Sequence, residues 1–119
     1  MAKKIRQQGE LEALVLEALW DSNVPLTSNQ VLDAVSDKGA LALTTVLTVL
    51  SRLIEKDLVN RLPADGRGYL FQATSTREEH AAAQLLEILE SSENLGLTLS
   101  HFASGLNKKT ISALKKSLE

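Results

Sequence analysis

The chain has 119 residues, with 13 Lys and Arg against 15 Asp and Glu, and no cysteine. This length fits one domain or one small domain with an appendage, and the missing cysteine excludes disulfides, thiolate metal sites and cysteine catalysis. The net charge of −2 argues mildly against nucleic-acid binding unless a local basic patch is present. Because no apolar run has the length of a membrane span and the basic start lacks a signal-peptide core, we expect a cytoplasmic protein without membrane insertion.

Apolar periodicity predicts two helices in the first third of the chain. The first covers residues 10–20, and its glutamates fall away from the apolar stripe. That stripe consists of Leu11, Leu14, Val15, Ala18 and Leu19. The second helix follows Thr27, which forms a capping-box pattern with Gln30, and we expect it to stop near Lys38 and Gly39.

A third helix is expected to begin around Leu43 or Thr44 and to end near Lys56 and Asp57. Its predicted inward stripe consists of Leu43, Val46, Leu50, Leu53 and Ile54. The opposite side carries Thr45, Thr48 and Arg52, although threonine is a mediocre helix former. A solvated surface explains such a face, and so does contact with phosphates and base edges.

The pattern then changes to two short apolar-rich segments, 58–62 and 69–73, separated by turn residues 64–68, which predicts a β-hairpin. Three helices followed by a hairpin are typical of a winged helix-turn-helix, a fold that is mainly α with a small β-hairpin. In that architecture the third helix enters the major groove of DNA. We expect base or phosphate contacts from Thr45, Thr48 and Arg52. Mainly phosphate contacts are expected from Arg61, Arg67, Lys3, Lys4 and Arg6.

The remaining residues, 76–119, are predicted to form three short helices after the winged-helix DNA-binding domain at 1–75. They begin at a capping box, Thr76 to Glu79, and the last helix is capped by Asn107. Since so short a segment rarely buries enough surface to fold alone, a second copy is the expected partner. The residues expected in this dimerisation region are Leu85, Ile88, Leu89, Phe102, Ile111, Leu114 and Leu118. The alternative is that these helices fold back on the first helix of their own chain.

Nothing in the sequence indicates an enzyme, a cofactor or a metal. Gly66 and Gly68 belong to a turn that no helix start follows, so they do not form a phosphate-binding loop. His80 and His101 lack carboxylates or thiolates in register, which metal sites require.

Three stretches resemble the BlaI/MecI (penicillinase repressor) family of bacterial winged-helix repressors: GELEALVLEALW at residues 9–20, TTVLTVLSRLIEKDLVNR at 44–61 and ADGRGYLFQAT at 64–74. The resemblance covers nearly the whole chain. It implies a homodimeric repressor on an inverted-repeat operator, with interlocked C-terminal helices. By position it also places Thr44 and Arg67 on the DNA-facing side.

The resemblance further implies regulation by cleavage. In members that control β-lactam resistance, a membrane sensor protease triggers a cut before a phenylalanine of the C-terminal domain, and the matching bond here is His101–Phe102. The best-known members have asparagine where His101 stands, and basic residues where Thr44 and Leu47 stand. A second interpretation is a winged helix used only for protein–protein contact, which the near-neutral charge of residues 1–75 favours.

Overall fold

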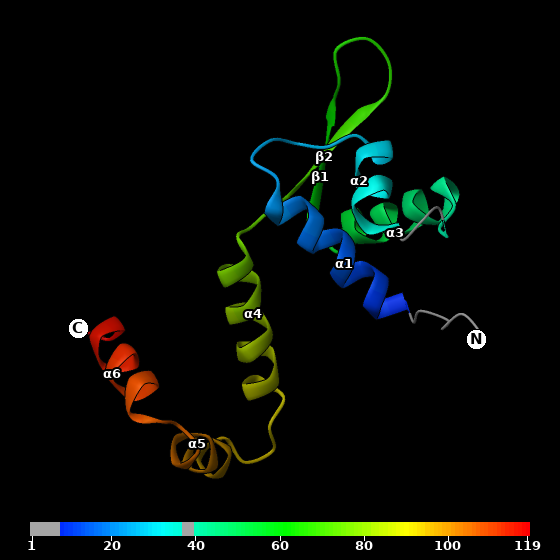
Figure 1. Ribbon diagram of the computed structural model, residues 1–119. Helices are drawn as coiled ribbons and strands as arrows, with labels where there is room; N and C mark the ends of the chain where they lie inside the picture. The colour runs from blue at the N-terminus through cyan, green and yellow to red at the C-terminus, as the bar shows by residue number, and fades with distance from the viewer. Residues whose placement is uncertain (1–7, 37–39) are drawn as a thin grey trace. The chain divides into compact units, whose positions relative to one another are not determined.

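The computed structural model describes residues 8–36 and 40–119. The chain divides into two compact units, Met1–Glu79 and His80–Glu119, here called the winged-helix unit and the tail unit. The elements, shown in Figure 1, are α1 (Gln8–Asp21), α2 (Ser28–Val35), α3 (Leu43–Glu55), β1 (Val59–Pro63), β2 (Tyr69–Ala73), α4 (Arg77–Glu90), α5 (Leu95–Ser104) and α6 (Lys108–Ser117). Among the described residues, no helix is both long and apolar enough to span a membrane.

The start of α2 is fixed by the capping box expected from the sequence. The Thr27 hydroxyl accepts a hydrogen bond from the Gln30 amide at 3.1 Å, and the Gln30 side chain accepts one from the Thr27 amide at 2.8 Å. The helix ends at Val35 because Ser36 already has extended backbone angles, φ −80° and ψ 133°. The predicted end near Lys38 and Gly39 is therefore too late, and those two residues lie outside the described part of the chain.

The predicted start of α3 is confirmed, and the helix ends at Glu55, one to two residues before the predicted end. Hydrogen bonds at its C-terminus show why it stops there. The amide of Asp57 donates to the Ile54 carbonyl at 3.0 Å, and the amide of Leu58 donates to the Leu53 carbonyl at 2.9 Å. This pair of bonds is a Schellman motif. Asp57 occupies the left-handed position with φ 62°, where glycine is usual and aspartate is tolerated.

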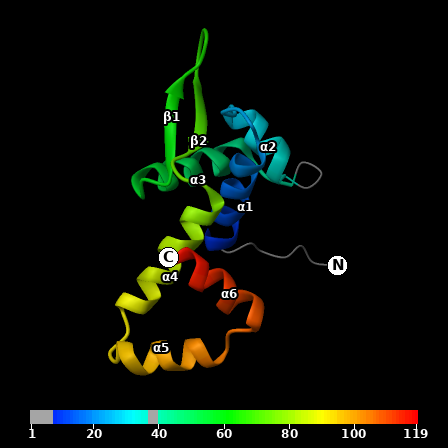
Figure 2. The same cartoon turned by 90° about the vertical axis from the view of Figure 1, so that its left-hand side faces the viewer.

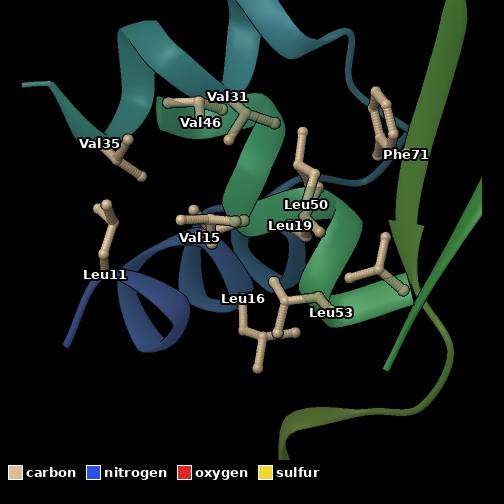
Figure 3. Close-up of a cluster of buried hydrophobic side chains, with 12 residues drawn as sticks. Leu11, Val15, Leu16, Leu19, Val31, Val35, Val46, Leu50, Leu53 and Phe71 are labelled. Atoms are coloured by element: carbon tan, nitrogen blue, oxygen red, sulfur yellow. The ribbon is translucent and has the colours of Figure 1, made fainter. Parts of the chain in front are cut away.

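The core lies where α1, α2 and α3 meet the hairpin, and Figure 3 shows side chains from these elements converging. Its buried members are Leu11, Val15, Leu16, Leu19, Val31, Val35, Val46, Val49, Leu50, Leu53, Val59 and Phe71. Leu16 and Val49 were not predicted as core residues, because the buried stripe is wider than the single row inferred from periodicity.

Glu12 corrects the predicted polar side of α1. Its side chain is only 11% exposed, and its carboxylate forms an ion pair with the Lys56 ammonium at 2.7 Å. Lys56 is the C-cap of α3, so this ion pair connects the first and third helices.

The hairpin of β1 and β2, here called the wing, is antiparallel, with Val59 opposite Ala73 and Pro63 opposite Tyr69. Figures 1 and 2 show it extending away from α1–α3. At its tip Gly66 and Gly68 have φ of 86° and 85°, which side chains other than glycine rarely adopt.

A short bridge that the sequence analysis missed joins the wing to the chain before α2. The Leu26 amide donates to the Phe71 carbonyl at 2.9 Å, and the Phe71 amide donates to the Leu26 carbonyl at 2.7 Å. Since Phe71 is itself in the core, this bridge fixes the base of the wing to the helices.

The first turn of α4 belongs to the winged-helix unit and is held against α1. The Arg77 guanidinium donates to Glu17 at 2.7 Å and to Asp21 at 2.9 Å, and it lies 5.4 Å from the centre of the Trp20 ring. Two acidic hydrogen-bond partners raise the pKa of Arg77 further above its ordinary value. The Trp20 indole also donates to the Ser75 carbonyl at 2.9 Å.

Each helix from α4 to α6 begins at a polar capping residue. Thr76 and Glu79 form the predicted capping box, with bonds of 2.8 and 3.0 Å. Asn107 caps α6 as predicted, accepting from the Thr110 amide at 2.8 Å. Asn94 caps α5 by accepting from the Leu97 amide at 3.0 Å, and Gly96 lies in the first turn of that helix. The first of these helices ends at Glu90.

Candidate nucleic-acid interface

Helix α3 has two sides of different character. Four apolar side chains on one side are buried: Val46, Val49, Leu50 and Leu53. On the other side Thr44, Thr45 and Thr48 are exposed, and Arg52 is half-buried. This exposed side, together with Leu47 and Ser51, is here called the outer face of α3. The first carboxylate of α3 is that of Glu55, at the end of the helix. The outer face can therefore approach an anionic surface without charge repulsion.

The hydroxyl of Thr48 is already used inside the helix. Its Oγ1 donates to the carbonyl of Thr44, one turn earlier, at 3.0 Å. Such a bond leaves the oxygen lone pairs and the γ-methyl group for a partner, but not the proton.

The N-terminus of α3 is not capped by a side chain. Its N-cap is Ala42, which has no side-chain oxygen to accept from the first amides of the helix. Uncapped amides and the positive end of the helix dipole favour an anion such as a phosphate near this end.

Arg52 is positioned by its place on α3 rather than by a polar partner. Its guanidinium makes no hydrogen bond or ion pair with the residues that the structure describes. Its five N–H donors therefore remain available for a phosphate or a guanine edge.

The wing carries two arginines in different settings. The Arg61 guanidinium lies 4.2 Å from the centre of the Tyr69 ring, a cation–π contact across the hairpin. Arg67 is exposed at the tip, between Gly66 and Gly68. No role was predicted for Tyr69. In the hairpin register Arg61 lies opposite Phe71 and Tyr69 lies opposite Pro63, so the contact between Arg61 and Tyr69 is diagonal.

The tail unit, which the structure describes completely, contains no buried residue. Its large apolar side chains that are at least one-third exposed are Leu85, Leu86, Ile88, Leu95, Leu97, Leu99, Phe102, Ile111, Leu114 and Leu118. Of the predicted dimerisation residues, only Leu89 is half-buried. The inward side predicted for α4 is therefore not covered within this single chain.

Comparison with known proteins identifies the family of the chain. Residues 8–119 match the penicillinase repressor family. The transcriptional regulator BlaI from each of two Mycobacterium tuberculosis strains is 34% identical, and the match covers 97% of this chain and 85% of that protein. The chain belongs to the penicillinase repressor family. It is a winged-helix transcriptional repressor similar to BlaI, and this family is not enzymatic.

Two solved structures also align with this member of the penicillinase repressor family. Bordetella bronchiseptica BpsR aligns at 25% identity and a TM-score of 0.48, covering 92% of this chain and 73% of BpsR. A MarR mutant from E. coli aligns at 20% identity and a TM-score of 0.44, covering 93% and 72%.

Of the residues predicted to contact DNA in this penicillinase repressor, Lys3, Lys4 and Arg6 lie outside the described residues. His80 and His101, for which no metal-binding role was predicted, stand on different helices, α4 and α5. The described residues contain no group of three or more potential metal ligands. His101 and Phe102 are both exposed near the end of α5, which ends at Ser104.

Proposed function

We propose that this penicillinase-repressor family member acts as a homodimer that occupies an inverted-repeat operator through two copies of α3. The observation that carries the proposal is the outer face of α3, where hydroxyls and a guanidinium that pairs with none of the described residues lie opposite a buried stripe. Family membership supports DNA as the partner in preference to another protein.

The residues of the outer face differ in the DNA contacts that their chemistry allows. Thr44 and Thr45 lie in the first turn of α3, beside uncapped amides, and contact phosphate or a base edge. Thr48 accepts from a base or touches it with its methyl group, since its proton is engaged. Arg52 reaches guanine or phosphate with its free donors. Flanking phosphate contacts come from Arg61, Arg67, Lys3, Lys4 and Arg6, which set affinity and register.

Dimerisation through α4, α5 and α6 gives their apolar sides a partner. These helices keep large apolar side chains exposed in one chain, among them Leu85 at 54% and Ile88 at 65%. Large exposed apolar patches mark protein interfaces, and we assign these side chains to a contact with a second chain. A second copy also fits by charge, because α4 carries four glutamates and one arginine while α6 carries four lysines and no acidic residue. In an isologous pair that places α4 of one copy beside α6 of the other, these opposite charges attract each other.

Derepression by a sensor-linked protease at His101–Phe102 completes the proposal. Both residues lie in the last part of α5, His101 three residues and Phe102 two residues before its end at Ser104. Proteases bind extended chain, so cleavage here requires the C-terminal turn of α5 to open locally, as helix ends do most readily. A cut at this bond separates α6 from the other tail helices. Mass spectrometry of the repressor from induced cells is expected to find a fragment beginning at Phe102, and an intact chain in derepressed cells contradicts this step.

The DNA-binding step is tested by a gel-shift titration with the DNA upstream of the protein's own gene, at 50 and 200 mM salt with competitor DNA. We expect a discrete complex at two chains per operator. Its affinity falls by roughly 10³–10⁵-fold between these salt concentrations if six to ten phosphates are contacted. No salt-sensitive complex with this or any other promoter overturns the proposal.

Arg52 offers a matched pair of variants for the same assay. Arg52→Ala is expected to weaken operator binding while leaving the dimer intact by size-exclusion chromatography. Arg52→Lys keeps the charge but loses the two-pronged donor geometry, so it retains the salt dependence and loses part of the sequence discrimination. A dimer that dissociates in Arg52→Ala shows that Arg52 has a structural role instead.

A further inference from the structure

One residue of the outer face of α3 is neither polar nor part of the core. Leu47 is 39% exposed, whereas the other apolar side chains of α3 are buried or half-buried. Helical spacing places it beside Thr44, three residues before it, and Ser51, four residues after it. An isolated exposed leucine needs no explanation. Its importance here depends on its neighbours.

Thr48, next to Leu47, presents an apolar group on the same face. Its hydroxyl proton is bonded to the Thr44 carbonyl at 3.0 Å, so Oγ1 is turned toward the helix backbone. The γ-methyl group occupies a different staggered position from Oγ1 and is left for a partner. The middle of the outer face therefore combines the Leu47 side chain with the Thr48 methyl group.

We propose that Leu47 and the Thr48 methyl group form an apolar strip that reads the C5-methyl groups of thymine in the major groove. This inference rests on the proposed function, since it requires α3 to enter the groove. Base edges in the major groove present hydrogen-bond donors and acceptors, and thymine alone adds a methyl group. A leucine side chain can neither donate nor accept, so the thymine methyl is the partner in the groove that gains from contact with it.

The strip also accounts for specificity on a face with few charged groups. Arg52 is the one basic side chain on the outer face, all of which the structure describes. Since phosphate contacts carry no sequence information and Arg52 is the one charged donor that α3 can offer to a base edge, apolar contacts contribute a large share of the discrimination between bases. The operator is accordingly expected to place thymines opposite the centre of α3.

The test compares the footprinted operator with the same duplex in which uracil replaces thymine at the protected positions. Uracil pairs like thymine and carries the same charge, and it lacks only the C5-methyl group. Wild-type repressor is expected to bind the uracil duplex about threefold to fivefold more weakly for each contacted thymine, which matches the ~0.8 kcal/mol typical of one buried methyl-sized group. Leu47→Ala is expected to bind the thymine operator more weakly and to lose most of this thymine–uracil difference.

Matched variants separate the apolar contact from polar or structural effects. Leu47→Met keeps a flexible apolar side chain and is expected to retain the thymine–uracil difference. Thr48→Val keeps a methyl group and removes the hydroxyl, so the difference persists. Thr48→Ser removes the methyl group and reduces it. Circular dichroism and size-exclusion chromatography check that each variant is folded and dimeric.

The possible failures are distinguishable. If wild-type protein binds no operator, the proposed function fails and this inference with it. If it binds thymine and uracil duplexes equally, the inference alone is overturned. A thymine–uracil difference that is unchanged in Leu47→Ala also overturns it, because another group must then read the methyl. Unchanged DNA binding together with loss of a protein partner in Leu47→Ala assigns the residue to a protein contact instead.

Discussion

The winged-helix unit and the tail unit both consist of short amphipathic helices, yet their apolar side chains lie in different environments. In the first unit Val15, Val46 and Leu53 are fully buried. In the second, no residue is buried, and Leu118 is 78% exposed. The same kind of periodic pattern therefore gives a core only where several elements of one chain meet.

Helix α3 also differs from the helices that follow the wing in how it begins. At the starts of α4, α5 and α6, the side chains of Thr76, Asn94 and Asn107 each accept a hydrogen bond from a backbone amide. Helix α3 has Ala42 at that position and no such bond, although it lies at the centre of the core. Side-chain caps stabilise a helix locally, whereas tertiary packing stabilises α3. The tail thus has well-defined helices without a core, and a second copy would supply the missing packing.

The largest expected effect is Leu53→Ala in the core of the winged-helix unit. Leu53 has no exposed surface, so truncation leaves a cavity and lowers the free energy of unfolding by about 2–5 kcal/mol. The loss is expected at every protein concentration, because the cavity lies within one chain. Urea titrations of the full-length protein at two concentrations measure it. A loss below about 1 kcal/mol would contradict the central position of α3 in the core.

Leu114→Ala is the matched truncation in the tail, where the same residue type is 44% exposed in one chain. If a second copy covers α6, this change weakens the dimer, and the melting temperature becomes more dependent on protein concentration. Leu85→Glu, which places a charge on the exposed side of α4, is expected to give a monomer in analytical ultracentrifugation. A wild-type protein that is monomeric at micromolar concentration contradicts dimerisation through the tail, because the tail helices would then be stable without a partner.

A smaller effect is expected at the ion pair between Lys56 and Glu12, which joins two elements of the winged-helix unit. Lys56→Met keeps the aliphatic part of the side chain and removes the ammonium from a carboxylate that is only 11% exposed. Because Lys56 is half-exposed, the expected loss is about 1 kcal/mol at neutral pH. Lys56→Arg, which keeps the charge, serves as the control in the same urea titration. Equal stability of Lys56→Met and the wild type would mean that packing alone holds α1 against α3.

Capping patterns, apolar periodicity and turn residues predicted those parts of the fold that depend on interactions between residues close together in the sequence. The capping boxes at Thr27 and Thr76, the start of α3 and the hairpin are confirmed. The bridge between Leu26 and Phe71 and the burial of Glu12 were missed, because both arise from partners more than forty residues away. No periodic pattern within one element encodes such partners.

The candidate site was predictable to a similar extent. Helical spacing placed Thr45 and Thr48 opposite the buried stripe, and the structure has both exposed. It did not reveal that the Thr48 hydroxyl bonds back to Thr44 or that Arg61 stacks on Tyr69, because side-chain conformations decide both contacts. The DNA contacts themselves remain predictions that the gel-shift experiments test.

The smallest expected effect is a gain in stability from Asp57→Gly. Asp57 is the left-handed residue of the Schellman motif, with φ 62°, and glycine adopts this conformation without steric cost. Because aspartate tolerates it better than most residues, the expected gain is at most about 1 kcal/mol. Asp57→Val, which has a branched Cβ at the same position, is expected to lose more than that amount. The same urea titration compares the two variants. If glycine instead destabilises the protein, the Asp57 side chain must contribute more at the end of α3 than its backbone conformation costs, and a local side-chain contribution would then matter for α3 as it does at the capped start of α2.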